Sequence, residues 1–126
     1  MFFDYVYKPD IYLISNLFKN KEMEDKSLIK KAVQNFDNFT KSQKAVLNVI
    51  VEFEKNDIAN ISVETIAQLS NVSKTIIYKN FIKLETLGLI TREKMANEQV
   101  GYIRLHSKAF QPIIEFYIKK KEFTQN

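Results

Sequence analysis

Residues 66–90 read IAQLSNVSKTIIYKNFIKLETLGLI, and this stretch decides the fold. Its second half predicts a helix over roughly 74–87, because apolar residues recur there at helical spacing. The buried stripe of that helix consists of Ile77, Phe81 and Leu84, closed by Leu87 or Leu89. Ser73 is a residue type that caps helix N-termini, and Gly88 is the type that follows helix C-termini. The sequence therefore predicts both ends of the longest helix in this stretch.

A shorter helix precedes it, over roughly 63–69. Ser62 can cap this helix, and Glu64 lies in its first turn, where the helix dipole favours an acid. We expect it to bury Ile66, Ala67 and Leu69. Asn71 tolerates a left-handed backbone, which a tight turn between two helices requires. Together the two segments predict a helix-turn-helix.

Upstream, Thr40 and Gln43 have the spacing of a capping box at the start of a helix over about 41–55. The apolar stripe predicted for this helix is Val46, Val49, Ile50 and Phe53. Asn56-Asp57 is expected to end the helix, and Ile61 to contribute a small strand. Apolar spacing also predicts a helix over roughly 24–37. Residues 11–18 fit either a short strand or a short helix.

Downstream of Gly88 the period changes to that of strands, at 89–95 and 100–106, joined by residues 96–99. In the second strand, Ile103 and Leu105 face one way, and Tyr102, Arg104 and His106 face the other. Pro112 opens a C-terminal helix. This order predicts a mainly α protein with a small β-hairpin wing, a winged helix-turn-helix at 41–106. Residues 1–40 would form an N-terminal arm and helix, and residues 107–126 the C-terminal helix.

Composition narrows the function classes. The chain has 126 residues, no cysteine and one histidine, which disfavours a disulfide framework, a thiolate or histidine metal centre and a histidine-based triad. No apolar run approaches the roughly 18 residues that a membrane span needs, and no export signal is recognisable, so we expect a cytoplasmic protein. No carboxylate pair, glycine-rich phosphate loop or activated nucleophile stands at a recognisable spacing. We therefore expect neither an enzyme nor a cofactor, although an effector pocket between the arms and the winged core stays open.

The formal charge of +4 is modest, but it is unevenly placed. Residues 1–60 carry 9 basic and 9 acidic side chains, whereas residues 73–84 hold three lysines and no acid. A local positive patch on a helix is typical of contact with nucleic acid. A solvated helix face is the other interpretation of such lysines.

The outward face of the helix at 74–87 provides the candidate contacts with double-stranded DNA. They are Ser73, Lys74, Thr75, Ile76, Tyr78, Lys79 and Lys83. Lysines can reach phosphates or guanine edges, Thr75 can bond a base edge or a phosphate, and Ile76 could lie against a thymine methyl group. Ser73 and the helix N-terminus offer N–H groups to a phosphate. Tyr78 fits packing against the core as well as base contact.

The predicted wing adds three further candidates, Arg92, Lys94 and Arg104. They could brace the DNA backbone or enter a minor groove, or the arginines could instead form salt bridges with Glu93 or Glu98. His106 is expected to be a surface strand residue.

The stretch 66–90 resembles the helix-turn-helix of bacterial winged-helix regulators such as the MarR and GntR families. The matching features are the small Ala67, the turn before Ser73, the pair Lys74-Thr75 and the closing Leu84-Glu85 through Gly88-Leu89-Ile90. Asn71 stands where glycine is usual in these families. The stretch is also similar to winged-helix modules of plasmid and phage replication proteins.

The resemblance implies a sequence-specific DNA-binding protein, with transcriptional regulation as the first hypothesis. A replication or mobile-element accessory factor that binds origin DNA is the second, and a winged helix that binds only protein is the third. The aromatic N-terminal arm and the C-terminal helix suggest a symmetric homodimer. The other interpretation is that these segments close the core of a monomer.

Overall fold

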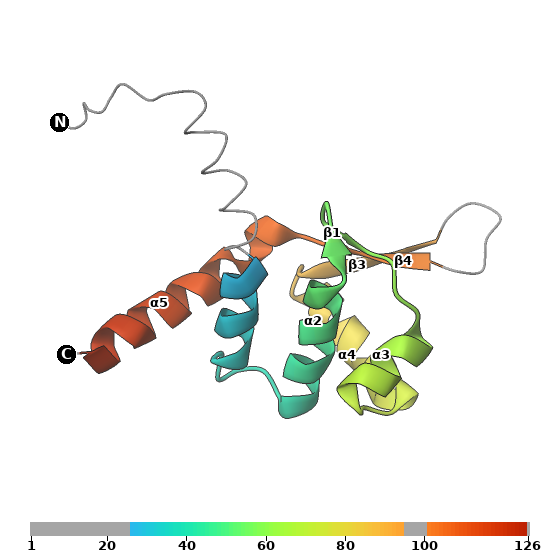
Figure 1. Cartoon of the computed structure of the whole chain (residues 1–126), viewed down its shortest axis with the longest axis horizontal. Coiled ribbons are helices and arrows are strands. Elements are labelled where there is room, and N and C mark those ends of the chain that lie inside the picture. Colours follow the sequence, from blue (N-terminus) through green and yellow to red (C-terminus); the bar gives the residue numbers. More distant parts are fainter. Residues whose placement is uncertain (1–25, 95–100, 126) are drawn as a thin grey trace, which may run out of the picture.

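The computed structural model describes residues 26–94 and 101–125. It begins with a helix at residues 26–34 and continues with α2 (Lys41–Glu52), a first hairpin, α3 (Val63–Ser70) and α4 (Lys74–Thr86). A second hairpin and the 3₁₀ turn η1 (Ser107–Phe110) lead into α5 (Gln111–Gln125). Figure 1 shows the strands across one end of α2, α3 and α4, with α5 and the helix at 26–34 to one side. The predicted winged helix-turn-helix is confirmed.

The helix α2 begins where the capping box predicts. The Thr40 side chain accepts a hydrogen bond from the Gln43 backbone N–H, and the Gln43 side chain accepts one from the Thr40 N–H. The helix ends at Glu52 rather than near residue 55, and Phe53 is exposed rather than part of the buried stripe. Only the C-terminal end of this prediction was wrong.

The error has a clear cause at Asn56-Asp57. Both residues have positive φ, 55° and 68°, which is the backbone of a tight two-residue hairpin turn. The turn joins β1 (Glu54–Lys55) to β2 (Ile58–Ala59), so these residues connect two strands instead of ending a helix. The small strand predicted at Ile61 lies three residues earlier, at Ile58.

The tight turn of the helix-turn-helix has the geometry expected from its residues. Ser62 caps α3 by accepting a hydrogen bond from the Thr65 N–H, and Asn71 follows the helix with φ 58° and ψ 38°. The Ser73 side chain accepts from the Ile76 N–H at the start of α4. Gly88 has φ +78° after α4, a conformation that suits glycine.

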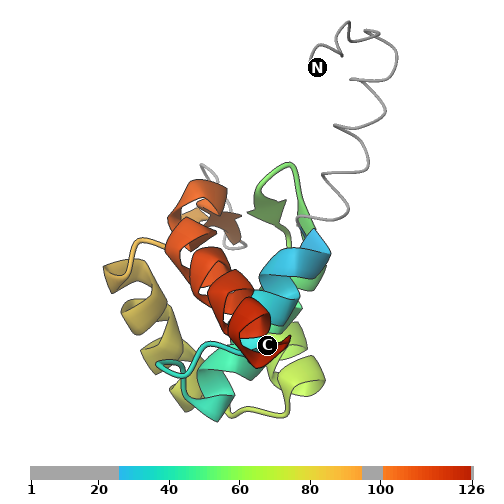
Figure 2. The ribbon, with the colours of Figure 1, turned by 90° about the vertical axis from the view of Figure 1, so that its left-hand side faces the viewer.

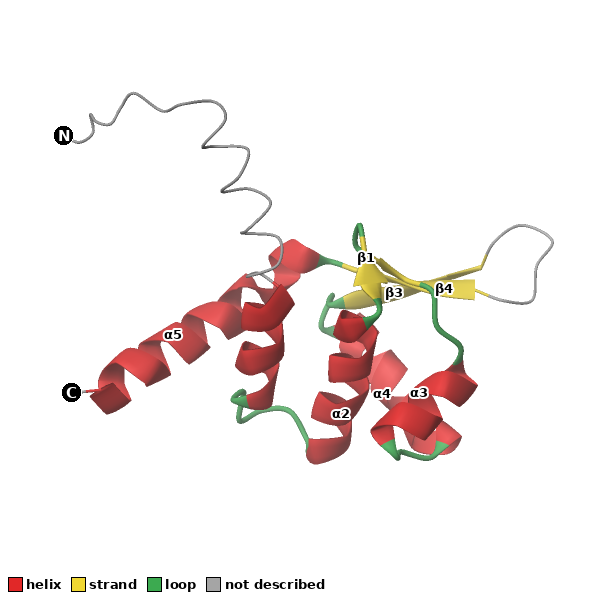
Figure 3. Ribbon diagram, viewed as in Figure 1, coloured by secondary structure: helices red, strands yellow, loops and turns green. Residues whose placement is uncertain are grey.

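The four strands form one antiparallel sheet in the order β1-β2-β4-β3. The wing strands are β3 (Ile90–Lys94) and β4 (Gly101–Leu105), paired from Ile90–Leu105 to Lys94–Gly101. Ile103 and Leu105 are buried, so the predicted alternation of β4 is confirmed. The strands gather on one side of the core in Figure 3, with the helices on the other. The predicted wing tip at residues 96–99 lies outside the described residues.

Every described helix contributes to one apolar core. Its fully buried side chains include Val33, Val46, Leu47, Ile50, Ile66, Ile77, Phe81, Leu84 and Phe110. The stripe predicted for α4 is buried as expected and is closed by Leu89, because Leu87 is exposed. In α3, Ile66 is buried but Leu69 is exposed, so the predicted burial of Leu69 was wrong.

The helix α5 follows η1 and begins at Gln111, one residue before the predicted Pro112. It runs beside the helix at 26–34 (Figure 2), and the rings of Phe36 and Phe116 meet edge-to-face, 5.5 Å apart. The Lys120 ammonium lies 3.3 Å from an Asp37 carboxylate oxygen. The N-terminal arm at residues 1–25, including the segment 11–18, lies outside the described residues.

Candidate nucleic-acid interface

The outer side of α4 is the part of the molecule on which the predicted contacts gather. Its inner side buries Ile77, Phe81 and Leu84, together with Asn80, whose amide donates to the Ser42 hydroxyl. All seven candidates of this segment are exposed: Ser73, Lys74, Thr75, Ile76, Tyr78, Lys79 and Lys83. Figure 2 places α4 along one edge of the molecule, away from α5. The helix therefore presents a positively charged side to solvent, on which Ile76 and Tyr78 are exposed beside the lysines.

Lys74, at the first position of α4, is held by an acid of α3. Its ammonium lies 3.1 Å from a Glu64 carboxylate oxygen, and both side chains are exposed. The pKa of Glu64 is lowered first by a hydrogen bond from its own backbone N–H and then by Lys74. An exposed pair of this kind contributes little to stability, so a phosphate can replace the carboxylate at small cost.

Lys79 and Lys83 differ from Lys74 because neither has an ion-pair partner in the part of the chain that the structure describes. They lie four residues apart, about one helical turn, on the exposed side of α4. Tyr78 is exposed too, and its ring meets the Phe81 ring edge-to-face with 6.0 Å between centroids. Tyr78 thus packs on the core with one edge and faces solvent with another.

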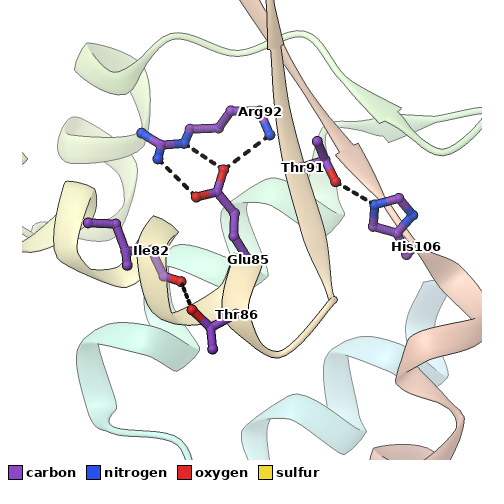
Figure 4. Close-up of polar contacts among 6 residues, drawn as sticks. All are labelled: Ile82, Glu85, Thr86, Thr91, Arg92 and His106. Atoms are coloured by element: carbon purple, nitrogen blue, oxygen red, sulfur yellow. Dashed lines mark hydrogen bonds and ion pairs between the residues drawn. The ribbon is translucent and has the colours of Figure 1, made fainter.

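The first wing arginine is tied to α4. Arg92 donates to the Glu85 carboxylate from Nε and Nη2, at 2.8 and 2.9 Å, and its backbone N–H lies 3.3 Å from the same group (Figure 4). Its guanidinium also lies 5.1 Å from the Phe81 ring centroid. The hydrogen bonds from Arg92 lower the pKa of Glu85 and raise that of Arg92. Glu85 was not among the predicted partners, which were Glu93 and Glu98, and Glu98 lies outside the described residues.

The second wing arginine pairs within the sheet. Arg104 donates from Nε to a Glu93 carboxylate oxygen 3.0 Å away, across the β3–β4 ladder, as one of the two sequence interpretations proposed. This pairing lowers the pKa of Glu93 and raises that of Arg104. Lys94 is the last described residue of β3, and its side chain lies outside the described part of the chain.

Two further features were not predicted. Ile82 is 59% exposed on the outer side of α4, next to the lysines, although apolar residues of a helix are usually assigned to its buried side. His106 is half-buried, and its Nε2 lies 2.6 Å from the Thr91 hydroxyl on the neighbouring strand (Figure 4). The angular position of Ile82, about 140° around the helix from Ile77, was the available signal for its exposure.

Away from α4, a cavity of about 840 Å³ lies between the helix at 26–34, the β1–β2 turn and the start of α5. Ile29, Asp57, Ser107, Gln111 and Ile118 are among the residues that line it. Within the described residues no group of acids or histidines could hold a metal ion. None of the described helices is long and apolar enough to cross a membrane.

Comparison with known proteins agrees with the helix-turn-helix. Residues 38–90, from the loop before α2 to the first residue of β3, match the family model of a helix-turn-helix domain. Among solved structures, the chain is similar to a point mutant of MepR from S. aureus, with 17% identity and a TM-score of 0.49, over 88% of this chain and 78% of that one. It is also similar to NadR in complex with 4-hydroxyphenylacetate, with 17% identity and a TM-score of 0.48, over 94% and 82% of the two chains. No curated protein matches it in sequence.

Proposed function

We propose that this protein is a sequence-specific double-stranded DNA-binding regulator of transcription that acts in the cytoplasm as a homodimer. The observation that carries the proposal is the exposed side of α4, where lysines stand without any acid from residue 73 to residue 84. The helix has 13 residues and is therefore about 20 Å long, which fits a major groove about 12 Å wide.

Each candidate has a role in this proposal. Lys74, Lys79 and Lys83 neutralise phosphates or reach guanine edges, and Thr75, Ile76 and Tyr78 face the bases. Ser73 presents the N-terminus of α4 to a phosphate. Arg92, Lys94 and Arg104 brace the DNA backbone from the wing. The side chains of Arg92 and Arg104 are 39% and 37% exposed, which supports a role in DNA contact. Each guanidinium has further N–H groups that do not bind its carboxylate partner and can donate to a phosphate.

The test is binding to genomic DNA fragments, followed by sequencing of the fragments retained. We expect a shared sequence motif upstream of genes, and we expect Lys74→Ala combined with Lys79→Ala to abolish binding. The matched control is Lys108→Ala with Lys119→Ala, which removes the same charge from exposed positions on η1 and α5. Unchanged affinity of the α4 variant, with an unchanged circular dichroism spectrum, would contradict the proposal. Enrichment of a replication origin instead would favour the replication role.

The homodimer has separate support. The first turn of α5 closes the core with Ile113, but further along the helix Phe116, Ile118 and Phe123 are exposed, Phe123 by 83%. Large exposed apolar side chains at a helix end are typical of interfaces. A molar mass by light scattering that equals one chain at every concentration would remove the dimer from the proposal.

A further inference from the structure

The apolar side chain of Ile82 lies in the middle of the charged side of α4. At 100° per residue, it points about 140° away from Ile77 and about 60° from both Lys79, three residues earlier, and Glu85, three residues later. The Glu85 carboxylate is bound by Arg92, whereas Lys79 has no ion-pair partner among the described residues. Isolated exposed apolar residues are common and need no explanation. Ile82, however, is 59% exposed on a helix side whose lysines Lys79 and Lys83 have no ion-pair partner among the described residues.

The charge around Ile82 indicates what covers it. A partner that approaches this surface meets the ammonium groups of Lys79 and Lys83, for which no acid of the described chain competes. The surface is the convex side of a single helix, so the partner must be concave and negatively charged. The major groove of a DNA duplex has both properties.

Inside the major groove, the 5-methyl group of thymine is the one apolar group that the four base pairs display. An isoleucine side chain can make no hydrogen bond to a base edge, so its contribution there is apolar contact. We propose that Ile82 determines specificity by packing against a thymine methyl group, an inference that rests on the proposed DNA-binding function. Ile76 and Ile82 are six residues apart, about 9 Å along the axis, so they meet different base pairs.

The test uses the full chain and the duplex recovered by genomic selection. Each thymine of the site is replaced in turn by deoxyuridine, which removes only the methyl group. For the unaltered protein, we expect one or two positions at which the loss of the methyl group weakens binding about fourfold, the worth of one buried methyl group. The Ile82→Ala variant should bind the original duplex more weakly and should be insensitive to the methyl group at one of those positions.

Two controls accompany the variant. Ile82→Val keeps a branched apolar side chain and should retain part of the sensitivity. Leu87→Ala truncates another exposed apolar residue, which lies about 140° around the helix axis from Ile82 and should leave the methyl profile unchanged. Alanine favours helix more than isoleucine does, and Ile82 is exposed, so the variant is expected to fold.

The outcomes separate the two hypotheses. If Ile82→Ala has the same methyl profile as the unaltered protein, while both bind the duplex with an affinity that depends on Lys79, the role of Ile82 is wrong and DNA binding stands. If no duplex is bound by the unaltered protein, the proposed function itself fails. A protein partner that protects Ile82, together with unchanged duplex affinity of Ile82→Ala, would also overturn the inference.

Discussion

Glu85 connects α4 to the wing through a single side chain. Its carboxylate receives two side-chain hydrogen bonds from Arg92 and lies within reach of the Arg92 backbone N–H. The pKa of Glu85 is lowered from its ordinary value of 4.5, first by the side-chain hydrogen bonds from Arg92. Since the folded pKa lies below the unfolded one, the contribution to stability is complete above about pH 4.5 and is lost as the pH falls through the folded pKa.

We therefore predict that Glu85→Gln lowers the free energy of unfolding at pH 7 by up to about 1 kcal/mol and by less at pH 3. Urea unfolding at the two pH values measures both numbers. Glu122→Gln, at an exposed position of α5, is the matched control and should change the free energy of unfolding at pH 7 by less than about 0.5 kcal/mol. An equal loss at both pH values would show that Glu85 acts by packing rather than by charge.

At Asn71, local stability depends on the backbone conformation rather than on a side-chain contact. Its φ of 58° places it in the left-handed region, and its side chain is exposed, so a substitution there removes no core contact. We predict that Asn71→Ala lowers the free energy of unfolding by about 1 kcal/mol, the cost of a left-handed backbone for an ordinary residue. Asn71→Gly should be more stable than Asn71→Ala and close to the unaltered protein, because glycine adopts a left-handed backbone without strain. Equal stability of the two variants in urea would contradict this.

Among the elements, the start of α4 is where substitutions can distinguish an effect on stability from an effect on DNA binding. The Ser73 hydroxyl accepts the Ile76 N–H at 3.4 Å, and the same helix end is proposed to face a phosphate. Ser73→Ala should lower the free energy of unfolding by about 1 kcal/mol because the cap is lost. Ser73→Asp should preserve that stability, since aspartate also caps, but should weaken duplex binding because it adds a negative charge. Wild-type affinity of Ser73→Asp would remove Ser73 from the interface.

The elements also show why the fold was predictable in most places. Caps at Thr40, Ser62 and Ser73 and the left-handed Asn71 act within a few residues, so local sequence contains their whole signal. The β1–β2 hairpin was missed because its strands have two residues each, too short for a period, and because Asn-Asp fits both a helix end and a tight turn. The strand β2 pairs with β4, about 45 residues further along the chain, and this long-range pairing favours the tight turn over a helix end.

The candidate interface was predictable to a similar extent. Burial of one α4 side follows from helical spacing, so the exposure of Lys79 and Lys83 could be anticipated. The partners of Lys74 and Arg92 could not, because Glu64 and Glu85 come within reach only when α3, α4 and β3 have packed together. Ile82 was missed for another reason: its residue type favours the core, whereas its angular position on the helix favours solvent.

At the scale of the whole molecule, the salt dependence of DNA affinity depends on the number of protomers that bind the duplex. Each lysine that neutralises a phosphate releases counterions, so the logarithm of affinity falls with the logarithm of salt concentration by about 0.9 per contact. In a symmetric dimer on one duplex, each substitution removes two such contacts. The salt dependence therefore counts protomers on the DNA as well as charges.

We predict that Lys83→Ala reduces this slope by about 1.8, because the proposed homodimer would lose one phosphate contact in each of its two protomers. Titrations of one duplex at a series of salt concentrations measure the slope, with Lys108→Ala as the control that should leave it unchanged. A reduction of about 0.9 would mean that one protomer engages the duplex, and then the exposed apolar side chains of α5 would need another explanation. No reduction at all would mean that Lys83 contacts no phosphate.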